Sequence, residues 1–229
     1  PQQMPKQPLI ELDYTFTKLS EEESVMTVLG AVHRQSGYPL AVRAVCKGVG
    51  DNYVVQELMA WLREIGLQGP ITVRTDSELP IRHLAQLLAK KRGESPTVLE
   101  VTPPGSCSSL GGVERFFESL HGQVRVMHLA LEQMWGEPVP SNSPWVAWLI
   151  RHAAWTIARY QPHKHLQNQT SFAVVREQDY RGEVFQFGAP VVALNHYATE
   201  QPKMSPRGQE GVYLGNRPDG DEPVVCVQG

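Results

Sequence analysis

The stretch that decides the fold is Leu9-Ile10-Glu11-Leu12-Asp13-Tyr14-Thr15-Phe16. Its apolar side chains alternate with Glu11, Asp13 and Thr15, which is the period of a half-buried β-strand. A carboxylate in the middle of a strand is a poor strand former and is costly to bury without a partner. Asp13 is therefore either an ordinary edge-strand residue that faces water or part of a site that requires a carboxylate.

Two later stretches carry acidic residues that favour the second interpretation. Ile71-Thr72-Val73-Arg74-Thr75-Asp76 is an apolar strand that ends in Asp76, and Gly111-Gly112-Val113-Glu114 opens a long helix with Glu114 in its first turn. Taken singly, Asp76 is an ordinary strand-end residue and Glu114 an ordinary first-turn acid favoured by the helix dipole. Together with Asp13 they form the three-carboxylate pattern of a two-metal phosphoryl-transfer site.

Length and composition limit the class of protein. The chain has 229 residues, of which 41% are hydrophobic and 20% charged, enough for one sizeable domain and a small appendage. No apolar run approaches the roughly 20 residues that span a bilayer, and the start shows no signal-peptide pattern. Three widely separated cysteines, Cys46, Cys107 and Cys226, predict neither a disulfide framework nor a zinc site of paired cysteines.

The charge balance is unfavourable to nucleic-acid binding overall, because phosphate binding is driven by Lys and Arg and the net charge is −3. Residues 151–181 are an exception, with only Glu177 and Asp179 as acids. The basic residues and histidines of this segment are Arg151, Arg159, Lys164, Arg176, Arg181, His152, His163 and His165. This segment could form a local basic face.

Hydrophobic periodicity predicts an α/β fold in the order β-β-β-α-β-α-β-α. Strands over 9–16, 25–32 and 39–45, joined by short turns, predict an antiparallel meander. The remaining elements are helices over 52–65, 79–92 and 113–135 and strands over 71–76 and 97–101. A helical crossover implies parallel pairing, so the strand of Asp76 is expected beside that of Asp13, with both carboxylates at one edge of the sheet.

The second half of the chain divides into a helical and a β-rich part. Residues 102–112 form a breaker-rich loop, Ser143-Pro144 starts a helix that runs to about residue 160, and a short helix begins near Ser171. From about residue 182, short predicted strands alternate with Gly/Pro turns and indicate a small β-rich module. Phe187-Gly188 is expected to be one of these strands. The expected organisation is a linker over 1–8, a core over 9–181 and a C-terminal module over 182–229.

Several short motifs, taken in order, resemble a known family. They are Glu11-Leu12-Asp13, Arg74-Thr75-Asp76-Ser77-Glu78, Ser109-Leu110-Gly111-Gly112-Val113-Glu114-Arg115-Phe116, Gln123-Val124-Arg125, Trp148-Leu149-Ile150-Arg151-His152-Ala153-Ala154-Trp155, Gln169-Thr170-Ser171-Phe172, Phe187-Gly188-Ala189-Pro190-Val191 and Gly211-Val212-Tyr213-Leu214-Gly215. The sequence resembles the integrase region of LTR-retrotransposon polyproteins, most closely the copia type. The resemblance implies an RNase H-like core, with a mixed five-stranded sheet flanked by helices, followed by a small β-rich module.

The resemblance also implies a chemistry. If the chain is an integrase, Asp13, Asp76 and Glu114 are its catalytic residues and the ligands of two Mg²⁺ (or Mn²⁺) ions. DNA 3′-end processing and strand transfer are in-line attacks on a phosphodiester, and two such ions stabilise the entering and leaving oxygens. We expect Asp13 to bridge the ions, with Asp76 on one and Glu114 on the other. Such an enzyme would act on element ends and target DNA, as a homo-oligomer, in the nucleus after synthesis in the cytoplasm.

Two departures from the family leave alternatives open. Leu110-Gly111 stands where integrases usually carry Asn-Gly, and the His/His/Cys/Cys zinc module that precedes such cores is missing, so no zinc is expected in this chain. The alternatives are another RNase H-like nuclease and a catalytically inactive descendant that binds DNA or protein. Without metal, three clustered carboxylates should raise at least one pKa and disorder the 106–112 loop.

Further side chains are candidates for DNA contacts or for ordinary structural roles. The basic candidates for DNA contacts are Arg115, Arg125, Lys90 and Lys91, with Arg115 and Arg125 expected on the side of the helix that carries Glu114. Each has a surface role as its alternative. Trp145, Trp148 and Trp155 are expected in the core or an interface. Cys107 has no histidine placed to activate it as a nucleophile.

Overall fold

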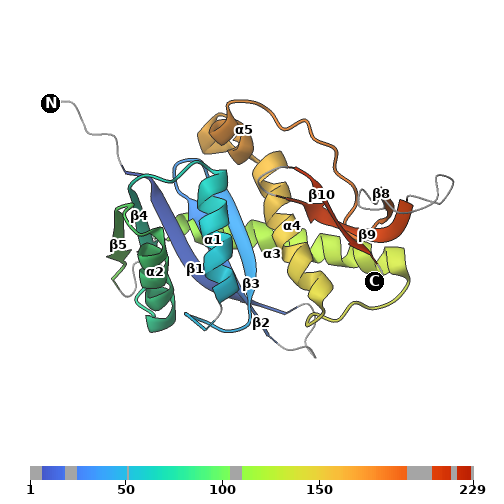
Figure 1. The fold of residues 1–229 in the computed structure, drawn as a ribbon, viewed down its shortest axis with the longest axis horizontal. Coiled ribbons are helices and arrows are strands. Elements are labelled where there is room, and N and C mark those ends of the chain that lie inside the picture. The colour runs from blue at the N-terminus through green and yellow to red at the C-terminus, as the bar shows by residue number, and fades with distance from the viewer. Residues whose placement is uncertain are drawn as a thin grey trace, which may run out of the picture.

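A computed structural model describes residues 7–18, 25–50, 52–103, 110–194, 208–217 and 221–227. Most of the expected linker, Cys107 and residues 106–109 of the expected loop lie outside the described residues. Figure 1 shows a twisted sheet flanked by helices at one end of the molecule and a smaller sheet at the other.

The main sheet has five strands in the order β3-β2-β1-β4-β5. Their bounds are β1 (Leu9–Thr17), β2 (Met26–His33), β3 (Tyr38–Ala44), β4 (Ile71–Thr75) and β5 (Thr97–Val101). β1, β2 and β3 pair antiparallel, whereas β4 pairs parallel with β1 and β5 parallel with β4. This confirms the predicted meander that continues into a parallel half.

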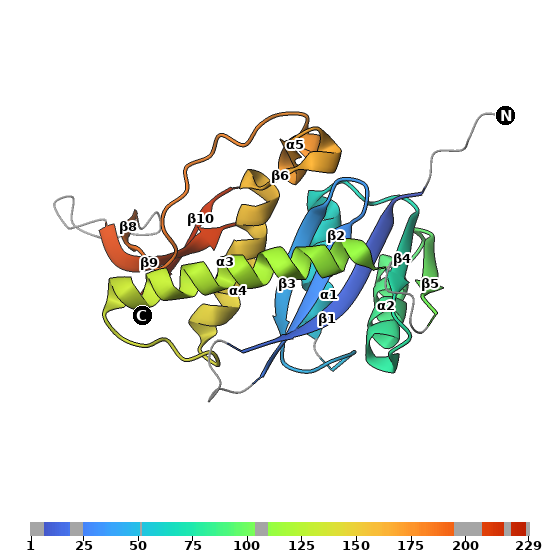
Figure 2. The same ribbon diagram turned by 180° about the vertical axis from the view of Figure 1, so that it is seen from behind.

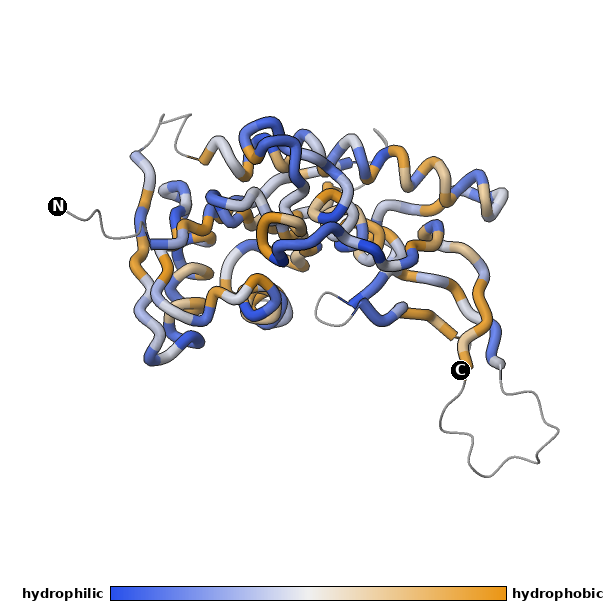
Figure 3. The backbone as a smooth tube through the Cα atoms, turned by 90° about the horizontal axis from the view of Figure 1, so that it is seen from above, coloured by the Kyte–Doolittle hydropathy of each residue, from blue (hydrophilic) through white to orange (hydrophobic). Residues whose placement is uncertain are grey.

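Helices cover both faces of this sheet (Figures 1 and 2). They are α1 (Asn52–Glu64), α2 (Leu79–Arg92), α3 (Gly111–Trp135), α4 (Pro144–Tyr160) and α5 (Ser171–Arg176). α1 and α2 share a core with Ile10 and Leu12 of β1, whereas α3 and α4 share a second core with β2. Apolar and polar residues alternate along α3 at the helical period (Figure 3). No helix in the described ranges is long and apolar enough to cross a bilayer.

A three-stranded antiparallel sheet, in the order β10-β9-β8, confirms the predicted β-rich module. Its strands are β8 (Pro190–Leu194), β9 (Gly208–Asn216) and β10 (Pro223–Val227). Phe187 and Leu214 lie in the same core as α3 and α4, so the small sheet is stabilised by those helices. Phe187-Gly188 was expected to be a strand, and this is wrong: Gly188 takes a φ of 81°, which belongs to a turn.

A short two-stranded hairpin joins α4 to α5. It consists of β6 (Pro162–His163) and β7 (Gln169–Thr170), with the 3₁₀ turn Lys164–Leu166 between them. Thr170 starts α5, because its hydroxyl accepts a hydrogen bond from the N–H of Ala173 at 3.1 Å. The hairpin thus returns the chain toward the β2–β3 turn, where Ser171 and His163 lie next to Gly37.

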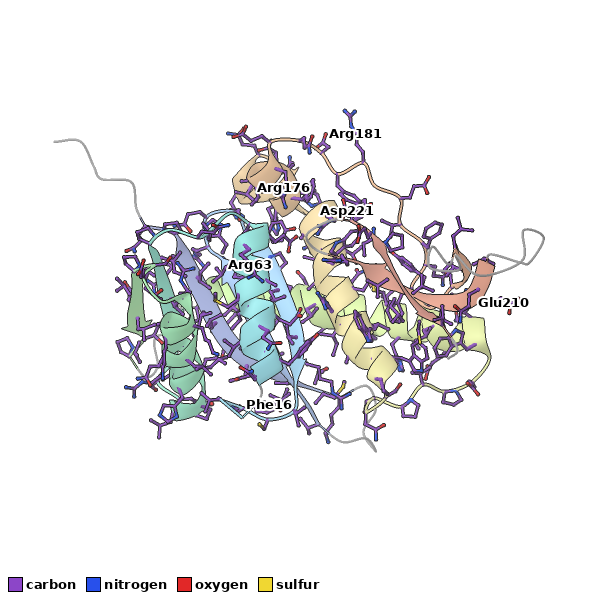
Figure 4. All side chains as sticks on the ribbon, viewed as in Figure 1. Phe16, Arg63, Arg176, Arg181, Glu210 and Asp221 are labelled. Carbon is purple, nitrogen blue, oxygen red and sulfur yellow. The ribbon has the colours of Figure 1, made fainter. Side chains whose placement is uncertain are left out.

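A basic face was expected over residues 151–181, and this prediction is wrong for two of the residues. Arg159 and His152 are each only 3% exposed. The Arg159 guanidinium lies 4.2 Å from the Trp155 ring centre, 3.3 Å from Glu64 Oε1, and donates to the Tyr38 hydroxyl at 3.2 Å. The amphipathic face of α4 turns these groups inward, and a buried arginine needs such partners. Arg181, by contrast, points away from the body of the protein (Figure 4).

Gly30 of β2 sets how closely α3 approaches the sheet, because a Cβ there would overlap the Phe117 ring. We predict that Gly30→Ala lowers the free energy of unfolding by about 1–3 kcal/mol through overpacking. Gly122→Ala in α3 is the control, because a Cβ added at Gly122 would have nothing within 4 Å. This variant should raise the free energy of unfolding by about 0.5–1 kcal/mol. Urea denaturation measures both, and equal changes would contradict the proposed packing.

Candidate functional site

Glu11, a completely buried carboxylate of β1, fixes the start of α3. Its Oε2 accepts hydrogen bonds from the N–H groups of Gly112 at 2.8 Å and Val113 at 3.0 Å. Its Oε1 lies 3.2 Å from Arg34 Nη1. The first turn of α3, which carries Glu114, is therefore attached to the strand that carries Asp13, two residues further on.

Asp13 and Asp76 meet at one edge of the main sheet. The parallel register of β1 and β4 pairs Leu9 with Thr72 and Glu11 with Arg74. Continued by two residues, it brings Asp13 level with Asp76, which directly follows β4. Their carboxylates also accept local N–H bonds: Asp13 Oδ1 from Tyr14 at 2.7 Å, and Asp76 Oδ1 from Glu78 at 3.0 Å.

The half-buried Asp13 carboxyl shows the effect of this crowding. Burial, together with the negative charges of Asp76 and Glu78, raises its pKa to about 6. The Tyr14 N–H and the Lys47 ammonium act in the opposite direction and lower the pKa. Burial is the largest cause of the raised pKa, and the neighbouring acids act in the same direction.

Lys47 is a member of this site that sequence reasoning missed. Its Nζ lies 2.5 Å from Glu78 Oε2 and 4.6 Å from the Phe16 ring centre. The loop that carries it is held to β1 because the Gly48 N–H donates to the Tyr14 hydroxyl at 3.0 Å. No local pattern indicated this contact, which joins residues more than 30 positions apart.

Glu114 is exposed in the first turn of α3 and is not among the charges that act on Asp13. In the described ranges, no three His, Cys, Asp or Glu side chains are arranged to hold a metal ion. The structure therefore brings Asp13 and Asp76 together, and the convergence of Glu114 with them stays a prediction.

The donor set at this edge suits a hard divalent cation. Mg²⁺ is commonly held in proteins by one or two carboxylates, with water and substrate phosphate as its remaining ligands. Asp13 and Asp76 provide two such carboxylates side by side. The raised pKa of Asp13 is the direction that an added cation would reverse. These residues therefore fit Mg²⁺ or Mn²⁺.

The basic candidates occupy different places. Arg125 lies three helical turns after Glu114 on the same flank of α3, the flank on which His121 contacts the Thr15 hydroxyl at 3.4 Å. Arg115 lies about 100° further round the helix than Glu114 and lines a cavity together with Ser119. A DNA contact of Arg115 stays a prediction.

Lys90 and Lys91 are exposed in the last turn of α2. The first turn of that helix follows Asp76, so a helix of 14 residues, about 20 Å long, separates these lysines from the acids. The neighbouring Arg92 is anchored to the backbone and donates to the Leu67 carbonyl at 3.0 Å.

Comparisons with known proteins bear on the fold. No family model and no curated protein matches the sequence at a significant level. Among solved structures, the HTLV-2 integrase catalytic core domain in complex with magnesium (dimeric form) is similar, with a TM-score of 0.50 and 12% identity, over 76% of this chain and 98% of that one. The simian T-cell lymphotropic virus intasome in complex with the PP2A regulatory subunit B56 gamma matches with a TM-score of 0.50 and 13% identity, over 98% of this chain and 77% of that one. The chain thus has the RNase H-like fold of retroviral integrase catalytic cores.

The raised pKa of Asp13 predicts a stability effect. Because the folded pKa of about 6 exceeds the unfolded value, the charged form destabilises the fold above pH 6. This cost disappears as the pH falls through 6 toward 4. Asp13→Asn in metal-free buffer should therefore raise the free energy of unfolding at pH 7.5 by about 1 kcal/mol, a figure reduced for solvent screening of a half-buried group.

The stabilisation by Asp13→Asn should be smaller when its free energy of unfolding is measured by urea denaturation at pH 4.5. Asp179→Asn is the matched control, because Asp179 is exposed and lies outside the acid pair. An Asp13→Asn effect that is equal at both pH values, or no larger than that of the control, would contradict the assigned electrostatics.

Proposed function

We propose that this chain is a metal-dependent polynucleotidyl transferase of the integrase type, which cuts and joins DNA at the sheet edge formed by Asp13 and Asp76. The observation that carries the proposal is the meeting of these two carboxylates across a parallel strand pair, with the pKa of Asp13 raised to about 6. The integrase-core fold of the chain supports the same reaction class by analogy.

The packing of α3 supports Glu114 as the third ligand. Glu11, Asp13 and Thr15 project from the same face of β1, and α3 contacts this row at both ends: Gly112 at Glu11 and His121 at Thr15. The helical rise from 112 to 121 and the strand rise from 11 to 15 are both about 13 Å. Glu114 lies between these contacts on the flank of His121, and we propose that its side chain reaches toward Asp13 when a metal ion is bound.

Each residue of the site has its own proposed role. Asp13, Asp76 and Glu114 hold the divalent ions, which when bound stabilise charge on the entering and leaving oxygens of the phosphodiester. Lys47 forms a 2.5 Å ion pair with Glu78 and so offsets one of the negative charges beside Asp13. Glu11 keeps the first turn of α3 against β1, so that Glu114 is held at a fixed distance from Asp13.

The finer assignments rest on motifs and similar structures. Asp76 and Glu114 have 37 residues between them, and this spacing with the β-rich tail supports an integrase of LTR-retrotransposon type. We propose the copia type from the short motifs alone. The similar HTLV-2 core domain is a magnesium complex in a dimeric form, which supports Mg²⁺ as the cofactor and a homo-oligomer here. We propose element ends and target duplex as the DNA substrates, 3′-end processing and strand transfer as the reactions, and the nucleus as the place of action.

One observation favours a second candidate, a catalytically inactive module that binds DNA or protein through the same fold. The described residues gather two acids and no third metal ligand, and Leu110 replaces the usual Asn at the entry to α3. The two candidates differ in metal-dependent cleavage.

Cleavage of supercoiled plasmid DNA in Mg²⁺ or Mn²⁺ distinguishes them. We predict metal-dependent nicking by the chain and a loss of at least about 100-fold in Asp76→Asn, because a lost metal ligand removes charge stabilisation at the phosphate. Asp179→Asn, which changes an exposed acid elsewhere, should nick normally. Equal nicking by Asp76→Asn, or no nicking by any form, would overturn the enzymatic proposal.

Arg125 provides a test of DNA binding on the acidic flank of α3. Arg125→Gln should weaken binding of duplex DNA and reduce the slope of log affinity against log salt by about one, since one phosphate contact is lost. Arg63→Gln, on α1 and the opposite face of the sheet (Figure 4), is the control. Fluorescence anisotropy at several salt concentrations measures both slopes, and unchanged slopes in both would exclude Arg125 as a phosphate contact.

A further inference from the structure

A cavity of about 560 Å³ lies on the flank of α3 that faces away from Asp13. Segments distant in the sequence converge on it: the β2–β3 turn, α3, the end of α4 and the hairpin that follows. Its polar lining residues are Arg34, Arg115, Ser119, Gln161, His163 and His165, with Glu118 as the one acidic residue. Its volume is in the range of small-ligand sites, and it belongs to neither the acid pair nor its metal ligands.

Several of these groups are held in place by other contacts. Arg34 is fixed by the buried Glu11 at 3.2 Å. Gly112 makes room for both, because a Cβ there would lie 2.5 Å from Glu11 Oε2 and 2.9 Å from Arg34 Nη1. On the opposite wall, the Ser171 hydroxyl and His163 Nε2 share a hydrogen bond of 3.1 Å.

The rest of the wall is also ordered. The Gln161 amide donates to the Ser119 hydroxyl at 3.2 Å, and the rings of His163 and His165 have their centres 5.4 Å apart. Arg34, Gln161 with Ser119, and His163 are therefore positioned before any ligand binds, which lowers the entropy cost of binding.

One of the two arginines that line the cavity is paired with an acid, and the other is left for a ligand. Glu11 is already committed to the first turn of α3 and to Arg34. Arg115 has no ion-pair or hydrogen-bond partner within the part of the chain that the structure describes. Glu118 is the one acidic residue of the lining. Burial, and then His165, lowers the pKa of His163, so this imidazole acts as a neutral hydrogen-bonding group. A free guanidinium beside neutral polar groups favours an anionic ligand.

We propose that this cavity binds a phosphate group of a nucleic-acid strand or a nucleotide. A tetrahedral oxyanion accepts hydrogen bonds from several directions, and here guanidinium, imidazole, amide and hydroxyl groups surround one space. Guanidinium forks bind phosphate through paired charge-assisted hydrogen bonds. A planar carboxylate needs only one such fork, so a wall with donors on several sides fits phosphate better. The site goes beyond the metal-dependent reaction and does not require it.

The test follows the imidazole resonances of His163 and His165 by NMR in metal-free buffer containing EDTA. The probes are inorganic phosphate, a nucleoside monophosphate and a short single-stranded DNA. We expect each probe that binds to shift these two histidines, with no shift at His83, which is exposed on α2. Strongest binding by DNA identifies a strand as the ligand, and equal binding by the mononucleotide identifies a free nucleotide.

Three variants assign the effect to the cavity. Arg115→Gln should weaken binding about threefold or more, and Glu118→Gln should tighten it about twofold, because they remove opposite charges from the same wall. Arg63→Gln on the far face of the sheet should leave binding unchanged. A glutamate-rich peptide is the competing ligand.

The proposal is overturned if phosphate and DNA leave His163 and His165 unshifted, if Arg115→Gln and Arg63→Gln behave alike, or if the peptide binds more tightly than DNA. Because divalent metal is absent, these outcomes are independent of whether the acid pair catalyses cleavage. A chain that binds phosphate here but does not nick DNA keeps this site and loses only the enzymatic function.

Discussion

The buried carboxylate of Glu11 is the constraint on which the rest of the structure depends. Burying a charge without partners costs several kcal/mol, and Glu11 is completely buried. Two N–H groups from the start of α3 donate to its Oε2, and the guanidinium of Arg34 forms an ion pair with its Oε1. One side chain thus fixes a strand, a helix and a turn, and it explains why Gly112 must lack a side chain at the point of contact.

This attachment divides the functional surface into two parts on either side of α3. On one flank, the parallel pairing of β1 and β4 brings Asp13 level with Asp76. On the other flank, Arg34 and Arg115 face a cavity together with two histidines. If both proposals hold, a nucleic-acid strand bound through a phosphate in the cavity would lie across α3 from the acid pair.

The sequence allowed the strand order and the meeting of Asp13 with Asp76 to be predicted, because period-two strands and helical crossovers impose a parallel register. Contacts between distant segments could not be predicted. Glu11 is visible in the sequence only as an acid in an apolar strand, and its three partners come from the β2–β3 turn and α3. Arg159 appeared to belong to a basic surface, yet α4 buries it against Tyr38 and Glu64. Periodicity does not reveal which charges will be paired inside.

We propose that Asp13 and Asp76 share a divalent ion and that Glu114 joins them. Anomalous diffraction from crystals of the protein grown with Mn²⁺ can locate such an ion. We expect an anomalous peak at the carboxyl end of β1 and β4, within bonding distance of the Asp13 and Asp76 carboxylates, with Glu114 turned toward the ion. No peak at this edge, or a peak bound only by other residues, would rule out a metal site formed by these acids.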